Sequence, residues 1–454
     1  MQPGTERTHE QDHPDISCAL MYITNHGFGQ VTSPRDFATP SNVAAGHEFL
    51  PETGSFPTRL PPEIVYEIMK FLDPSNLVTA ALLSKATRAI AERVLYGDPE
   101  PKSVKVIRCL QTLVMRPDLA SITRRLTIYD LTRTFEMCGS YLSLLSRALH
   151  SVSSLTDLTL LLDGPYAKYF RGCSFRLRSL STTLVWDDDL VLWLEEQSEL
   201  TNAMFGGHFV KGTVLPQNAL RKLSHVSAVP LILSATVPGR PVRGVEICLL
   251  HPELMKADIL WTTTRILSFS TGPLSSMQII ADIEDAADAL TALNVISQNV
   301  PKLDSFALYA GHGSVTRDFL DKLSGFVSGF EFLRSIMLMS RDPRDVLSDA
   351  SLLEGLAPAW HSCCPTLECV SFAGSIWVRN MRYGWVTLSD LERLLRERVD
   401  TLAERERELA AGNLLNGINE DEAEHEDREQ QMERQMQSQI VAIRAGMIQY
   451  GAGL

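Results

Sequence analysis

The stretch that most restricts how this chain can fold is a series of helix starts and stops between residues 60 and 96. Pro61 and Pro62 fit the first turn of a helix, where an N–H group has no partner inside the helix anyway. Apolar residues then recur at intervals of four and predict one helix face: Leu60, Ile64, Ile68 and Leu72. Asp73 and Ser84 stand where side-chain oxygens cap two further helices. Three helices of about 10 residues enclose a poor core alone, so such a unit needs a partner surface.

This stretch resembles an F-box. The resemblance rests on Leu60-Pro61-x-Glu63-Ile64, Ile68-x-x-x-Leu72, Asp73-Pro74, Leu77 and the turn Leu83-Ser84-Lys85. It implies a three-helix domain over residues 56–98 that docks a Skp-family adaptor and, through it, a cullin. The residues it implies for adaptor binding, some of which would serve the internal core instead, are Leu60, Pro61, Ile64, Ile68, Leu72, Leu77 and Leu83. The alternative is an ordinary three-helix part of a larger domain.

A weak repeat with the skeleton Leu-x-x-Leu-x-Leu follows, between residues 120 and 385. In each copy the apolar residues alternate, as they do in a strand with one buried face. The middle positions recur about every 22 residues at first, which lies within the range of leucine-rich repeats; they are residues 158, 180, 203, 223, 245 and 267. Later copies centre on Phe306, Ile336 and Val370, and the segments between copies show helical spacing.

The repeat resembles the degenerate leucine-rich arrays that follow F-boxes in many fungal proteins. That resemblance implies an α/β solenoid over residues 120–385, with a curved parallel sheet and helices outside. Side chains that alternate with the buried ones would then contact a target protein, and the examples are Tyr129, Thr159, Glu246, Ser268, Tyr309 and Met337. The alternative is a generic α/β domain whose parallel strands are apolar.

Composition excludes several classes of protein. The net charge of −13 provides no excess of cations to neutralise phosphates, which argues against a nucleic-acid partner. No run approaches the roughly 20 apolar residues of a membrane helix, and no secretory leader is expected. The eight cysteines are scattered along the chain, which fits a reducing compartment, so the cytoplasm or the nucleus is expected.

The two ends of the chain are expected to lie outside the globular part. Residues 1–55 are rich in Pro, Gly, Ser and Thr without periodicity, and they are predicted to be disordered. Residues 386–454 are predicted to form a charged helical and acidic tail. Its first part is a helix with Glu–Arg pairs, and its acidic run spans residues 420–427.

No catalytic residue, metal ligand or cofactor site is predicted. Gly325-Phe326-Val327-Ser328-Gly329 lacks the central serine of a nucleophile elbow, and Gly311-His312-Gly313-Ser314 is a glycine-rich turn with a lone histidine. Adjacent cysteines cannot easily reach one tetrahedral metal ion, which argues against a site at His361, Cys363, Cys364 and Cys369. The three aspartates of residues 187–189 are better explained as a helix cap.

Taken together, these patterns indicate the substrate-recognition subunit of a Skp-cullin-F-box type ubiquitin ligase. The F-box would dock the adaptor, the repeats would hold a target protein, and the transfer chemistry would belong to other subunits. An interaction scaffold that uses the F-box fold outside any ligase is the first alternative. A hydrolase built on a generic α/β domain is the second.

Overall fold

The computed structural model describes residues 60–102, 105–129, 139–249, 256–283, 285–310, 315–340, 350–372 and 375–410, together with residues 434, 438 and 441. The expectations for residues 1–55, for the acidic run and for Gly311–Ser314 lie outside the described residues. The described part divides into two compact units, residues 60–222 and residues 223–410.

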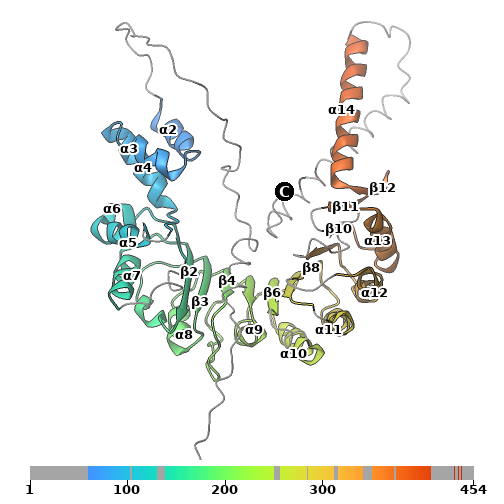
Figure 1. Ribbon diagram of the computed structural model, residues 1–454, viewed down its shortest axis with the longest axis horizontal. Helices are drawn as coiled ribbons and strands as arrows, with labels where there is room; N and C mark the ends of the chain where they lie inside the picture. The colour runs from blue at the N-terminus through green and yellow to red at the C-terminus, as the bar shows by residue number, and fades with distance from the viewer. Residues whose placement is uncertain are drawn as a thin grey trace, which may run out of the picture. The chain divides into compact units, whose positions relative to one another are not determined.

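Three short helices open the first unit (Figure 1): α2 (Pro62–Met69), α3 (Pro74–Ala81) and α4 (Lys85–Gly97). Asp73 caps α3, because its Oδ1 accepts hydrogen bonds from the backbone N–H groups of Ser75 and Asn76 at 2.9 and 3.0 Å. Ser84 caps α4 by accepting from the N–H of Thr87 at 3.1 Å. Both caps lie where the sequence predicts them, since capping is a local signal.

Two further helices fill a part of the chain that the sequence left unassigned, and they are α5 (Lys105–Met115) and α6 (Pro117–Ala120). Val106, Leu110 and Leu113 form the buried face of α5. This helix packs against α7 (Gly139–Ser151), and α6 contacts α4. The three opening helices are therefore joined to the strands through a small helical layer.

Four parallel strands of the first unit neighbour one another in chain order: β1 (Arg125–Ile128), β2 (Asp157–Gly164), β3 (Ser179–Leu184) and β4 (Asn202–Phe205). After α7, the connections between them contain the 3₁₀ helix η2 (Ala167–Phe170) and α8 (Asp188–Glu195). Leu126, Leu158, Leu180 and Ala203 are side by side in the register, and all four are buried. The first four copies of the predicted strand skeleton are therefore strands.

The second unit continues the pattern with six parallel strands: β5 (His225–Ala228), β6 (Gly244–Leu249), β7 (Ser276–Ala281), β8 (Ser305–Ala310), β9 (Ser335–Ser340) and β10 (Cys369–Phe372). Five helices lie along one side of these strands (Figure 1): α9 (Pro230–Thr236), α10 (Ala257–Leu267), α11 (Ala286–Asn299), α12 (Arg317–Val327) and α13 (Ala350–Cys363). The ring of Phe306 on β8 meets that of Phe326 on α12 edge-on, with centroids 4.9 Å apart. We call this side of the strands the helix face and the other side the open face.

An antiparallel hairpin ends the second unit. β11 (Ser375–Asn380) pairs with β10 and then with β12 (Gly384–Thr387). The charged helix α14 (Leu388–Ala410) packs on these two strands, and its buried residues are Leu388, Leu391 and Leu395. Arg393 pairs with Glu397 at 3.0 Å along the helix, as the predicted i,i+4 spacing requires.

Two of the predicted repeat copies are not strands, which corrects the sequence analysis. Leu220 and Leu223 are buried in the turn region before β5, and Leu267 is the last residue of α10. The strands at these places begin later, at His225 and Ser276. The reason is that a few apolar residues ending a buried helix or turn have the same spacing as those of a short strand. The remaining copies are parallel strands, so the α/β class is as predicted.

Candidate protein-interaction surfaces

The helices α2, α3 and α4 share a very small core. Met69, Leu77, Ala80 and Ala91 are its buried members, and six further apolar residues pack partly against it. Seven large apolar side chains of α2 and α3 and the turns beside them remain between 48% and 82% exposed, namely Leu60, Ile64, Ile68, Phe71, Val78, Leu82 and Leu83. We call these seven residues the apolar surface. Exposed apolar side chains this dense on so short a segment are typical of a docking site.

The sequence located most of this surface. Five of the seven residues implied for adaptor binding are exposed: Leu60, Pro61, Ile64, Ile68 and Leu83. Leu72 packs partly against the core, and Leu77 is only 1% exposed, so Leu77 is corrected to a core residue. The reason is that α3 packs on α4 with the side of the helix that carries Leu77. The sequence alone does not show which side of α3 faces α4.

Three exposed residues were missing from that set. Val78 on α3 and Leu82 in the turn that follows stand four residues apart, next to the core residue Leu77 and to Ala81, which packs partly against the core. The spacing of four was therefore a usable signal of a second apolar side. Phe71 lies in the turn after α2 and is 66% exposed; it stands seven residues after Ile64 and three after Ile68, so helical spacing places it on the same apolar side.

The comparisons with known proteins bear on this same segment. Residues 57–96 match the F-box domain. No curated protein matches the chain. The F-box resemblance of the sequence is thus confirmed, and it suggests a role in substrate recognition for a ubiquitin ligase or in protein interaction. F-box domains typically bind Skp-family adaptors, and F-box proteins are generally adaptors rather than enzymes.

The open face of the second unit carries a polar row across three strands. Ser227 on β5, Glu246 on β6 and Gln278 on β7 are neighbours in the register, and all three are buried. The two carboxylate oxygens of Glu246 accept hydrogen bonds from Ser227 Oγ and from Gln278 Nε2, each at 2.5 Å. Because both oxygens are already engaged, this carboxylate links strands rather than standing ready for a ligand.

The other predicted target contacts are distributed over both units. In the first unit, Thr159 on β2 and Tyr129 just after β1 are half-buried. In the second, Tyr309 and Met337 are buried, and the Tyr309 hydroxyl lies 3.4 Å from Met337 Sδ. Ser268 is a correction, because it is the C-terminal cap of α10 rather than a strand residue.

Burial of the carboxyl group raises the pKa of Glu246 to about 7, against an ordinary value of 4.5, although its two hydrogen bonds act in the opposite direction. The folded chain then holds this proton more tightly than the unfolded chain. Its stabilising contribution is complete below pH 4.5 and is lost as the pH rises through about 7. The contribution of Glu246 to the free energy of unfolding should fall by about 3 kcal/mol over that interval.

Glu246→Gln removes the titrating group and keeps the side-chain shape, so it should abolish most of this loss. Urea unfolding at pH 5 and pH 8 measures it, with the exposed Glu331→Gln as the matched control. Identical pH dependence for Glu246→Gln and the parent chain would contradict the assignment.

The side chains that could support chemistry are buried thiols or helix caps. Cys173 Sγ lies 3.8 Å from His150 Nδ1, but burial raises the pKa of this thiol to about 12, so it stays protonated at neutral pH. Burial likewise raises the pKa of Cys369 to about 12. Asp187 caps α8 by accepting from the N–H of Leu190 at 2.9 Å, as predicted.

The described ranges contain neither a cluster of metal-binding side chains nor a helix that could span a membrane. No group of three or more His, Cys, Asp or Glu side chains there is placed to hold a metal ion. No helix in these ranges combines the length and the apolar character needed to cross a bilayer.

Proposed function

We propose that the chain is the substrate-recognition subunit of a Skp-cullin-F-box type ubiquitin ligase. The observation that carries this proposal is the apolar surface, seven exposed side chains on and beside the two leading helices of a segment that matches the F-box domain. An adaptor that covered this surface would remove these side chains from water, and that transfer supplies most of the affinity of such contacts. The adaptor would in turn bring the cullin.

The adaptor-binding residues we propose are those that the fold leaves accessible. They are the predicted residues Leu60, Pro61, Ile64, Ile68 and Leu83, with the addition of Phe71, Val78 and Leu82. Leu72 packs partly against the core of the three helices, so we propose that it stabilises the apolar surface rather than contacting the adaptor.

The repeated helix–strand segments are proposed to hold the target protein as a leucine-rich-repeat-like solenoid. In support of this, β1 to β4 of the first unit and β5 to β10 of the second are parallel neighbours in chain order, and the helices α9 to α13 lie on one side of the second set. Stacked repeats of this kind leave one face of the sheet for binding. Tyr129 and Thr159 are the proposed target contacts, because their side chains are half-exposed, whereas Glu246, Tyr309 and Met337 would shape the open face from within.

Docking is tested by replacing Ile64 and Ile68, which are 48% and 50% exposed on α2, with alanine together. Each change removes about 1–1.5 kcal/mol of apolar burial, so binding of a purified Skp-family adaptor should weaken by roughly 30- to 150-fold. The Kd of the full-length chain for the adaptor measures this effect. Leu231→Ala is the matched control, since Leu231 is 60% exposed on α9 of the other unit.

An unchanged adaptor Kd for the double variant would rule out the docking proposal. The presence of a cullin in the purified adaptor complex separates a ligase subunit from a scaffold that uses the F-box alone. A complex with adaptor but without cullin would favour the scaffold.

A further inference from the structure

The chain continues past the F-box match as a segment that lies along the first strand. Arg124 N–H donates to the Gly97 carbonyl at 2.9 Å, and Thr127 N–H donates to the Pro99 carbonyl at 3.2 Å. These bonds occupy backbone groups on the edge of β1 that no other strand of the first unit pairs with. An open strand edge is prone to wrong pairing, so this segment protects the start of the sheet.

Side chains reinforce the same contact. Arg125 Nε pairs with Asp98 Oδ2 at 3.2 Å, and the Tyr129 hydroxyl donates to Glu100 Oε1 at 2.9 Å. The hydroxyl of Thr123, which is fully buried, lies 2.8 Å from the carbonyl oxygen of Tyr96, the last residue of the F-box match. Polar contacts therefore join the end of the F-box to residues 123–129.

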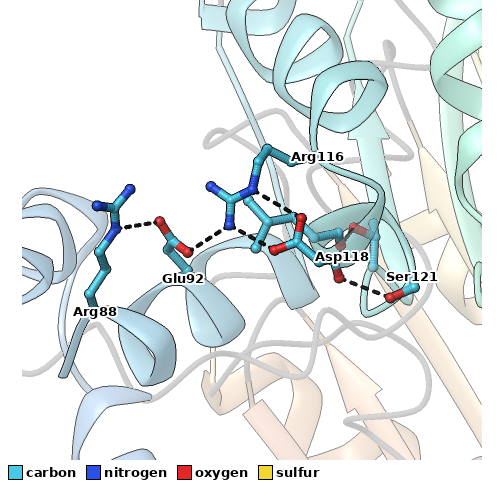
Figure 2. Close-up of polar contacts among 7 residues, drawn as sticks. Arg88, Glu92, Arg116, Asp118 and Ser121 are labelled. Atoms are coloured by element: carbon cyan, nitrogen blue, oxygen red, sulfur yellow. Dashed lines mark hydrogen bonds and ion pairs between the residues drawn. The ribbon is translucent and has the colours of Figure 1, made fainter. Parts of the chain in front are cut away.

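A second contact, nearer the N-terminus of α4, is made by charged groups (Figure 2). Arg116, between α5 and α6, binds both oxygens of Asp118 at 2.9 and 2.7 Å. Its Nη2 also donates to Glu92 Oε2 on α4 at 3.1 Å. Arg88 on the same helix takes the other oxygen of Glu92 at 2.9 Å.

The geometry of this network makes Arg116 the bridging group. Its planar guanidinium binds one carboxylate through two nitrogens and still presents an N–H to a second, which the single ammonium of lysine cannot do. The hydrogen bonds from Arg88 and Arg116 hold the pKa of Glu92 below its usual range, so this carboxylate stays charged at neutral pH. In this network, the bond from Arg116 to Glu92 is the one that leaves the helical layer of α5 and α6 and reaches the F-box.

We propose that Arg116, which lies outside the F-box match, is a positioning residue that fixes α4 of the F-box on the first strands of the array. The F-box of this chain is then not a tethered module but the N-terminal end of the first unit. This joint would keep the adaptor-binding surface and the proposed target contact Thr159 in one fixed arrangement. That consequence for a ligase rests on the proposed function. The joint itself does not depend on that function.

Hydrogen exchange of the full-length chain, followed by mass spectrometry, tests the joint. Arg116→Gln and Glu92→Gln should each speed exchange of the Arg124 and Thr127 amides by roughly two- to five-fold, the range expected when one ion pair is lost. The double variant should exchange no faster than either single variant, because both remove the same bond. Arg88→Gln is the matched control, since it removes a partner of Glu92 within α4 and should leave these amides unchanged.

Unchanged exchange in Arg116→Gln would overturn the proposal, and so would an equal increase across β2, β3 and β4, which would show general destabilisation. The adaptor Kd of the same variants should stay within about two-fold of the parent, since none of the network residues belongs to the apolar surface. A loss of adaptor binding without faster exchange would also overturn it. Failure of the docking proposal would instead appear in the Ile64 and Ile68 variant alone.

Discussion

Gly207→Ala should destabilise the first unit more than alanine at any other described glycine of that unit. A Cβ atom on residue 207 would overlap the carbonyl oxygen of Leu184 and lie 2.8 Å from that of Thr183, both backbone atoms at the end of β3. Flanking bonds fix the approach, since Gly206 N–H donates to Thr182 O at 2.8 Å and Trp186 N–H donates to His208 O at 2.7 Å. Relief of the overlap would require the end of β3 to separate from the segment that follows β4.

Separation would disturb a closely packed aromatic pair. Trp186 is fully buried, and its ring meets Phe205 edge-on with centroids 5.0 Å apart. We expect a loss of about 3 kcal/mol or more, the upper range for overpacking of a core. Denaturant unfolding followed by tryptophan fluorescence measures it.

Gly139→Ala is the matched control in the same unit, because no atom lies within 4 Å of its added Cβ at the start of α7. It should change the free energy of unfolding by no more than about 0.5 kcal/mol. Equal unfolding midpoints for Gly207→Ala and Gly139→Ala would show that the close approach to Leu184 does not restrict the fold.

Phe306→Ala should cause a large loss of stability in the second unit. Phe306 is fully buried on the helix face of β8, and Phe326, which it contacts, meets Phe330 in turn at 4.9 Å. Truncation leaves a cavity between strand and helix as well as losing apolar burial, so we expect about 3–5 kcal/mol. Urea unfolding of the full-length chain measures the change.

Phe332→Ala makes the same chemical change at a side chain that is 53% exposed in the same unit. It should cost less than about 1 kcal/mol, since little packing is lost. A similar loss for both variants would mean that Phe306 does not anchor α12 on the strands.

The position of the proposed docking segment was predictable from the sequence because its signals are local. Asp73 and Ser84 cap helices through residues two or three positions away, so the stops and starts need no knowledge of the rest of the fold. The order of apolar and polar residues likewise located the strands around Leu158, Phe306 and Ile336.

The sequence could not decide which apolar residues of that segment face water. Leu77 and Val78 are adjacent and equally apolar, yet Leu77 is 1% exposed and Val78 is 53% exposed. The difference arises from the packing of α3 on α4, which is a tertiary contact. Spacing alone identifies two candidate faces of a helix and cannot choose between them.

The sequence by itself thus determined the F-box segment, the α/β class and most of the strands. Only the tertiary structure showed that α5 and α6 pack between the F-box and β1 and that Glu92 bonds to Arg116, 24 positions along the chain. It also showed that two of the predicted strands begin later, at His225 and Ser276. The physical reason is the range of the interactions. Caps and periodicity act within a few residues, whereas ion pairs across helices and the choice between strand and helix end depend on parts of the chain that meet only after folding.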